Sequence, residues 1–146
     1  VNDIPGTMFE RMRDIGTPDI NRLLICSPFL SEIEFDGWRD IVKGIKKIKL
    51  LTRPARQGNG GVGDTAKHRD MIDFFEEVGA EVSTFPNLHA KIFIIDANEL
   101  SFAVFGSANL TGAAGTLNTE AAIFVNDLDQ VDDMEKAFNE IEYQQT

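Results

Sequence analysis

The chain has 146 residues, 42% of them hydrophobic and 26% charged, which is typical of a globular domain with its own core. Its net charge of −10 argues against a broad basic surface for duplex DNA, but leaves room for a small basic site. The sequence shows no signal peptide and no apolar run near the ~20 residues of a membrane span, and its single cysteine excludes an intrachain disulfide, so we expect a cytoplasmic location.

The first part of the chain alternates between helical and strand patterns. Apolar residues at helical spacing predict helices over 7–15 and 35–45. Short apolar runs predict buried strands over 22–27 and 47–51. Cys26 lies in the first of these runs, so we interpret it as a core residue and not as a reactive thiol.

A glycine-rich segment follows over residues 52–64. Three of its glycines formally match G-x-G-x-x-G, but several residues separate them from the preceding strand, which argues against a dinucleotide site. They are Gly58, Gly60 and Gly63. Two interpretations stay open. The segment is either a mobile surface loop or a loop that lines a site, with Arg53 or Arg56 reaching a substrate phosphate.

The remaining elements complete a regular pattern. A helix is expected over 65–78, with His68 on its polar side as a solvated residue and not a ligand. Strands are then expected over 81–85, 91–95, 102–105 and 121–125, and a closing helix over 127–143. Alternating strands and helices followed by a hairpin predict a single α/β domain over residues 1–146, with a mixed β-sheet flanked by helices on both faces.

A polar motif marks the predicted hairpin. It reads H-x-K-x(4)-D, with His89, Lys91 and Asp96, and the next strand ends in G-S-x-N. In an extended strand His89 and Lys91 share a face, and the residues after them are apolar on both faces, which predicts a central, doubly covered strand. A buried lysine needs an anionic partner, either a phosphate or an internal carboxylate.

The G-S-x-N segment favours the phosphate. An antiparallel hairpin of residues 89–96 and 101–107 brings the histidine and the lysine to its open end, near Ser107 and Asn109. These two side chains can donate hydrogen bonds to phosphate oxygens, while Lys91 stabilises the charge that develops on phosphorus.

Two motif residues receive structural roles. Gly106 lets the backbone come close to a ligand. Asp96 lies at the far end of the strand from His89, about 20 Å away at roughly 3.3 Å per residue. We therefore expect it to serve in turn closure and not in catalysis.

This pattern, between Leu88 and Ala122, resembles the HKD signature of the phospholipase D superfamily. The resemblance implies a phospholipase D-like α/β/α sandwich that cleaves phosphodiesters without a metal or another cofactor. It implies that His89 attacks phosphorus and forms a phosphohistidine. It also implies that Glu120, within Asn118-Thr119-Glu120, orients the nucleophile. The implied catalytic residues are His89, Lys91, Asn109 and Glu120.

The chain carries one HKD motif, whereas the chemistry needs a second histidine to protonate the leaving group. The single-motif branch of the family builds one site across a two-fold dimer, so we expect a homodimer. The leading hypothesis is a nuclease acting on nucleic acid or another phosphodiester substrate, as a domain that further domains of a longer chain could accompany. The alternatives are a phospholipid phosphodiesterase or transphosphatidylase, and a catalytically silent binding or dimerisation module.

Overall fold

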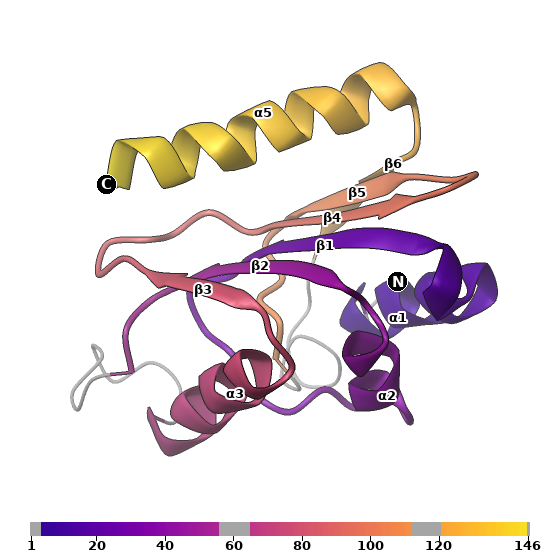
Figure 1. The fold of residues 1–146 in the computed structure, drawn as a ribbon. Helices are drawn as coiled ribbons and strands as arrows, with labels where there is room; N and C mark the ends of the chain where they lie inside the picture. The colour runs from indigo at the N-terminus through magenta and orange to yellow at the C-terminus, as the bar shows by residue number, and fades with distance from the viewer. Residues whose placement is uncertain (1–3, 56–64, 112–120, 146) are drawn as a thin grey trace.

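A six-stranded mixed sheet organises the parts of the chain that the computed structural model describes, which are residues 4–55, 65–111 and 121–145. The strands lie in the order β3-β2-β1-β4-β5-β6 (Figure 1). They are β1 (Ile20–Cys26), β2 (Lys47–Thr52), β3 (Glu81–Thr84), β4 (Ile92–Ala97), β5 (Phe102–Gly106) and β6 (Ala122–Val125). Each strand expected from the sequence is present, with its ends displaced by at most two residues.

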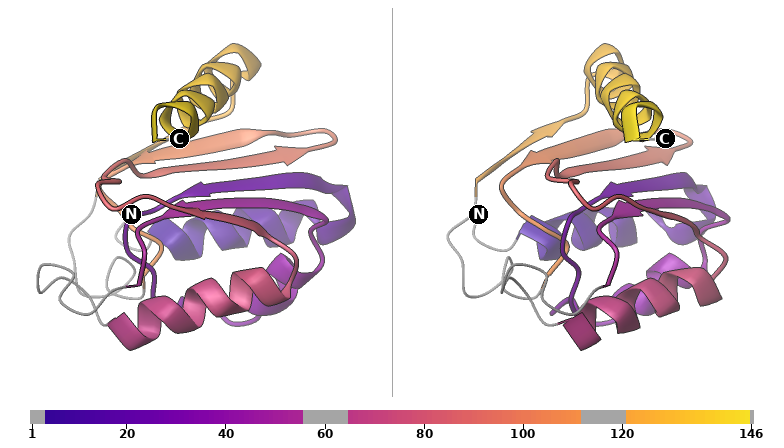
Figure 2. Two further views of the ribbon diagram at one scale, coloured as in Figure 1. Left: turned by 60° about the vertical axis from the view of Figure 1, so that its left-hand side comes forward. Right: turned by 90° about the vertical axis from the view of Figure 1, so that its left-hand side faces the viewer.

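Helices cover both faces of this sheet, which confirms the predicted α/β fold class. One face carries α1 (Ile4–Ile15), α2 (Trp38–Lys43) and α3 (Thr65–Glu77), and the opposite face carries α5 (Leu128–Gln145). Both turned views in Figure 2 keep α5 on its own side of the sheet. A short 3-10 turn, Thr17–Asp19, joins α1 to β1. Among the helices described, none has the length and apolarity needed to cross a membrane.

The central strand β4 is apolar on both faces because it separates two cores. Phe93 and Ile95 pack into the core under α1, α2 and α3. Ile92 and Ile94 pack into the second core, which includes Phe138 of α5. Alternate side chains of a strand point to opposite faces, so a strand covered on both sides has no place for a polar stripe.

The strand directions bring several strand ends to one edge of the sheet. Strands β1, β2 and β3 run parallel, and β4 pairs antiparallel with β1 in the register Cys26–Ile92. Strands β4 and β5 form the predicted antiparallel hairpin, with Ile92 opposite Phe105, and β6 returns with Ala122 opposite Gly106. The ends of β1, β2 and β5 therefore meet the starts of β4 and β6 at one edge, which we call the site edge.

Two helices begin three residues away from their predicted starts. The first helix begins at Ile4, three residues early, with Pro5 in its first turn, where a missing N–H costs no hydrogen bond. The second begins at Trp38 and not at residue 35, because Gly37 takes a left-handed conformation with φ 82° directly before it. Both helices still bury the apolar side that the spacing predicted.

At the opposite ends of the strands from the site edge, ion pairs join the sheet to α5. Arg22 of β1 bonds to Asp96 of β4 at 2.9 Å and also pairs with Glu135 of α5. Lys49 of β2 reaches Glu142 of α5 at 2.7 Å. These half-buried pairs fix the helix over the sheet at the edge remote from the polar motif.

Gly106 is required by the close approach of β6, which gives a first prediction. A Cβ atom at this position would lie 2.2 Å from the carbonyl oxygen of Ala121. We expect Gly106→Ala to lower the free energy of unfolding by about 1–3 kcal/mol, the usual cost of overpacking. Urea denaturation measures this loss, and an unchanged midpoint would contradict the packing argument.

Gly37→Ala provides the control for that measurement. Gly37 also has a positive φ, but a Cβ atom there would meet nothing within 4 Å. Its cost is the conformational penalty alone, about 1–2 kcal/mol. Displacement of β6 is expected only for the Gly106 variant.

Candidate active site

The site edge collects the polar residues of the motif. His89 and Lys91 precede β4, Ser107 follows β5, and Asn109 lies two residues further on. Because Ile92 pairs with Phe105, the chain before β4 and the chain after β5 leave the sheet at the same place. The structure thus brings the H-x-K and G-S-x-N segments to one edge, in the arrangement that the hairpin predicts.

His89 and Lys91 do not lie in the strand itself, which corrects the expectation of a buried lysine. The backbone hydrogen-bond ladder between β1 and β4 ends at the pair Cys26–Ile92, two residues before Pro28. His89 is exposed and Lys91 is half-buried. The Lys91 ammonium donates a hydrogen bond to the His89 carbonyl at 3.0 Å. Its cost of burial is therefore small, and its charge stays beside the histidine.

Ser107 is engaged with β6. Its hydroxyl accepts a hydrogen bond from the backbone N–H of Ala121 at 3.1 Å and lies 3.3 Å from the Ala121 carbonyl, to which its own backbone N–H also donates at 3.0 Å. The close approach that Gly106 permits is thus to the backbone before β6, a reason that the sequence did not reveal. Both residues hold the last strand at the site edge.

Asn109 is oriented by Ser27, a buried residue that the sequence analysis did not single out. The Ser27 hydroxyl donates to the Phe29 carbonyl at 2.9 Å, accepts a hydrogen bond from the N–H of Leu110 at 2.9 Å, and lies 3.4 Å from the side-chain oxygen of Asn109. The NH₂ group of Asn109 lies on the side of the amide away from Ser27, where it can donate to a ligand. A buried serine directly after an apolar strand is the signal that could have identified Ser27.

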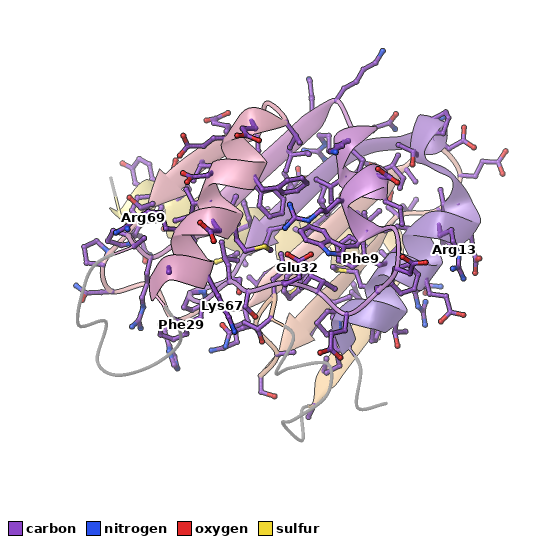
Figure 3. All side chains as sticks on the ribbon, turned by 90° about the horizontal axis from the view of Figure 1, so that it is seen from below. Phe9, Arg13, Phe29, Glu32, Lys67 and Arg69 are labelled. Carbon is purple, nitrogen blue, oxygen red and sulfur yellow. The ribbon has the colours of Figure 1, made fainter. Side chains whose placement is uncertain are left out.

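Arg53 lies at the end of β2, on the same edge. Its Nε donates to the carbonyl of Leu88 at 2.6 Å, one residue before His89, and its guanidinium lies 5.0 Å from the centre of the Phe29 ring. The side chain of Arg53 thus links the loop after β2 to the loop that carries the histidine. Figure 3 shows Phe29 and Lys67 at the end of the molecule where α3 begins.

His68 is the clearest departure from the sequence analysis. The prediction of a solvated side chain is wrong, because His68 is only 3% exposed. Its Nδ1 accepts a hydrogen bond from the N–H of Leu30 at 3.0 Å, and its Nε2 lies 2.7 Å from the Arg53 carbonyl. Burial lowers the pKa of His68, against an opposing effect of the hydrogen bond to the Arg53 carbonyl.

The helical spacing contained the signal for this burial. His68 lies three, four and seven residues before Met71, Ile72 and Phe75, which all face the core. A histidine in register with an apolar stripe points inward like its neighbours. The prediction placed His68 on the polar side of the helix because it stands next to Arg69, which is exposed.

Cys26 is fully buried, as expected for a core residue, and it lies against the site edge, where its sulfur is 3.5 Å from the Ala90 carbonyl. Burial raises the pKa of the Cys26 thiol to about 12, against the opposing charge of Lys91. We expect iodoacetamide to alkylate it about 10³-fold more slowly in the native chain than in the denatured chain at mildly alkaline pH. Mass spectrometry of timed samples measures both rates, and equal rates would contradict this burial.

The other predicted residues separate into two groups. Asp96 lies near the opposite edge, where it accepts hydrogen bonds from Arg22 at 2.9 Å and from the Ser101 hydroxyl at 3.0 Å, across the β4–β5 turn. The glycine motif at Gly58, Gly60 and Gly63, together with Arg56 and Glu120, lies outside the described residues. Within the ranges described, no three His, Cys, Asp or Glu side chains gather as metal ligands.

A protein-family model matches most of this chain. The model is described as "Cardiolipin synthase, PLD-like domain", and it matches residues 21–142, from β1 into the closing helix α5. The matched span includes the whole H-x-K-x(4)-D and G-S-x-N pattern. Among curated proteins, none has a sequence that matches this chain significantly.

Solved structures with the same fold include two bacterial proteins of similar size. Nuc from Salmonella typhimurium, a phospholipase D family member, aligns with a TM-score of 0.67 and 16% identity over 97% of this chain and 90% of its own. NucT from Helicobacter pylori aligns with a TM-score of 0.61 and 13% identity, over 93% and 87%. The archaeal chromatin protein TrmBL2 aligns with a TM-score of 0.57 and 19% identity, over 99% of this chain and 50% of its own.

Proposed function

Because this chain belongs to the phospholipase D superfamily, we propose that it is a metal-independent phosphodiesterase, and more specifically a nuclease domain. The observation that carries the proposal is the convergence of His89, Lys91 and Asn109 at one edge of the sheet, next to Arg53. A nucleophile, two cations and an amide donor in one place suit a phosphate diester. In a chain of net charge −10, such a local group also steers the anion to one place.

The proposed reaction has two steps. An imidazole nitrogen of His89 attacks phosphorus, a P–N bond forms, and the bond from phosphorus to the leaving oxygen breaks as that oxygen takes a proton from a second histidine. Water then attacks phosphorus as the second histidine takes a proton from it, and the P–N bond breaks, which restores both rings. Lys91 and the Asn109 amide stabilise the charge on the non-bridging oxygens, and Ser107 is proposed as a further contact to them.

Three further residues complete the proposal. Glu120 holds the ring of His89 in the tautomer whose free nitrogen faces phosphorus. Arg53 and Arg56 contact a neighbouring phosphate of the substrate. The position of Arg53 beside Leu88 supports this role, because its side chain already reaches the segment that carries the nucleophile.

The second histidine is proposed to come from another copy of the chain. The sequence contains two histidines, and His68 is buried with both ring nitrogens occupied by backbone groups. It cannot reach a leaving group from that position without losing both contacts. We therefore propose a two-fold dimer in which His89 of the partner subunit protonates the leaving group. His89 is exposed, as this pairing requires.

Two alternatives each have one observation in their favour. The description of the matching family model names a cardiolipin synthase, which favours a phospholipid diester as the substrate. The likeness to TrmBL2, whose structure shows a mode of DNA binding, favours a silent DNA-binding module. An accessible His89 with Lys91 beside it favours the catalytic reading over the silent one.

The test is hydrolysis of bis-p-nitrophenyl phosphate in the presence of EDTA. Turnover by the wild-type chain supports a metal-independent diesterase, and its absence at every pH tested would favour the silent module. Nicking of plasmid DNA or cleavage of single-stranded oligonucleotides supports the nuclease. Release of a headgroup from phospholipid vesicles, without any cleavage of DNA or RNA, would favour the lipid enzyme.

A further inference from the structure

The buried side chain of His68 links two loops whose backbones also meet where the N–H of Arg53 donates to the Pro28 carbonyl. It lies in the first turn of α3, and it contacts Leu30 in the loop after β1 and Arg53 in the loop after β2. We propose that His68 is the positioning residue of the active site, and that its two hydrogen bonds hold the nucleophile His89 and the phosphate donor Asn109 in one geometry. This inference rests on the proposed function.

The hydrogen bonds require one form of the ring. A backbone N–H can only donate, so Nδ1 must carry a lone pair toward Leu30. The proton is then on Nε2 and donates to the Arg53 carbonyl. This is the neutral Nε2–H tautomer. A second proton on Nδ1 would face the N–H of Leu30 and break that contact, so the bridge exists only with a neutral imidazole.

The first branch of the bridge runs through Arg53 to His89. The backbone N–H of Arg53 donates to the Pro28 carbonyl at 3.4 Å, and its carbonyl accepts from His68, so its backbone is held from two sides. Its Nε then donates to the carbonyl of Leu88 at 2.6 Å. Leu88 is buried in the core on the α5 side, and the next residue is the exposed His89. His68 therefore fixes the anchor from which the nucleophile projects.

The second branch runs through Leu30 to Asn109. Leu30 forms a β-bridge with Leu110, and the N–H of Ser31 donates to the Leu110 carbonyl at 3.1 Å. The N–H of Leu110 donates to the Ser27 hydroxyl, which itself donates to the Phe29 carbonyl and lies 3.4 Å from the side-chain oxygen of Asn109. Holding Leu30 in place therefore holds the segment that aims the Asn109 amide.

A purely structural histidine would need only to fill space and satisfy its own polar atoms. Here both ring nitrogens bind backbone groups of two different loops, and each loop leads to a different proposed catalytic group. An apolar side chain of similar volume would fill the space but would leave the N–H of Leu30 and the carbonyl of Arg53 without this partner. The proposal therefore predicts that replacing His68 lowers kcat by more than the accompanying loss of stability can explain.

The experiment uses substitutions that keep one branch each. In His68→Asn the amide oxygen reproduces the acceptor at Nδ1, and in His68→Gln the amide NH₂ reproduces the donor at Nε2. His68→Leu removes both. The fold control is Phe75→Leu, which alters a fully buried side chain of the same helix whose ring packs against Trp38 and Phe74. Each full-length variant is measured for thermal unfolding, for kcat and KM with bis-p-nitrophenyl phosphate, and for the NMR signals of the His89 ring and the Asn109 side-chain amide.

We expect His68→Leu to lower kcat by about 10²-fold, as displaced catalytic groups do, with a smaller change in KM. His68→Gln should preserve the His89 ring signals and shift those of the Asn109 amide, and His68→Asn should do the reverse. Phe75→Leu should lower the unfolding temperature and leave kcat and both sets of signals unchanged. In wild type, ¹⁵N NMR should show the neutral Nε2–H tautomer of His68.

Two results would overturn the proposal. One is a folded His68→Leu variant with wild-type kcat and unchanged signals from His89 and Asn109. The other is a wild-type His68 ring with its proton on Nδ1. If wild type hydrolyses no diester, the proposed function fails instead, and the NMR signals still decide whether His68 positions the two residues.

Discussion

Hydrolysis of bis-p-nitrophenyl phosphate is expected to fall by at least about 10³-fold when His89 is replaced by alanine. The proposed mechanism routes both steps through this ring, so no other group can compensate for its loss. His89 is exposed and precedes β4, so the substitution should leave the unfolding temperature unchanged. Steady-state rates in EDTA, together with circular dichroism, measure the two effects separately.

Lys46→Ala serves as the matched control for His89→Ala. Lys46 is exposed and lies directly before β2, at the edge of the sheet opposite the site. It should keep the wild-type rate. Retention of more than about a tenth of the activity by His89→Ala would exclude the phosphohistidine mechanism. An acid-labile, base-stable phosphoryl adduct, trapped on wild type by alkaline quenching, would identify the intermediate directly.

The shared site gives the second large effect. If one site needs His89 from both subunits, an equal mixture of wild type and His89→Ala forms mixed dimers that are inactive. After subunit exchange, the activity should fall to about a quarter of that of wild type at the same total concentration. Independent sites would retain about half. The measurement is the rate as a function of the fraction of wild-type chain, which should follow a square law.

The same titration with Lys46→Ala in place of His89→Ala should leave the rate unchanged at every fraction. A linear dependence in the His89→Ala titration would show that each chain acts alone. Light scattering provides the independent measurement, since an active monomer at the assay concentration would contradict the shared-site proposal.

Much of the fold could be predicted because its signals are local. Apolar runs and helical spacing identified each strand that the structure describes and the inward sides of α1, α2 and α5. The strand from Ile92 was expected to be covered on both faces, and its side chains do divide between two cores. Errors in the bounds arose where a single backbone conformation decided them, as Gly37 did for α2.

The site was less predictable because its contacts join distant segments. Lys91 was expected in a strand, but the hydrogen-bond ladder between β1 and β4 ends at the pair Cys26–Ile92. Where it ends depends on β1, which lies far earlier in the chain. The hydroxyl of Ser107 was expected to contact a substrate, and the structure adds a contact to the backbone of Ala121 that the sequence did not reveal. The hydrogen-bond partners of a polar side chain are set by the tertiary fold, and the spacing of residues in the sequence does not reveal them.

The sequence by itself determined the α/β architecture and the superfamily, because periodic burial and the H-x-K-x(4)-D spacing are properties of short segments. Only the tertiary structure decided how the edge residues are held. His68 is bonded to a backbone group 38 residues away and to another 15 residues away, and both contacts exist only after β1, β2 and α3 have packed together. Hydrogen-bond geometry in a buried bridge depends on the relative placement of whole elements, which no local pattern encodes.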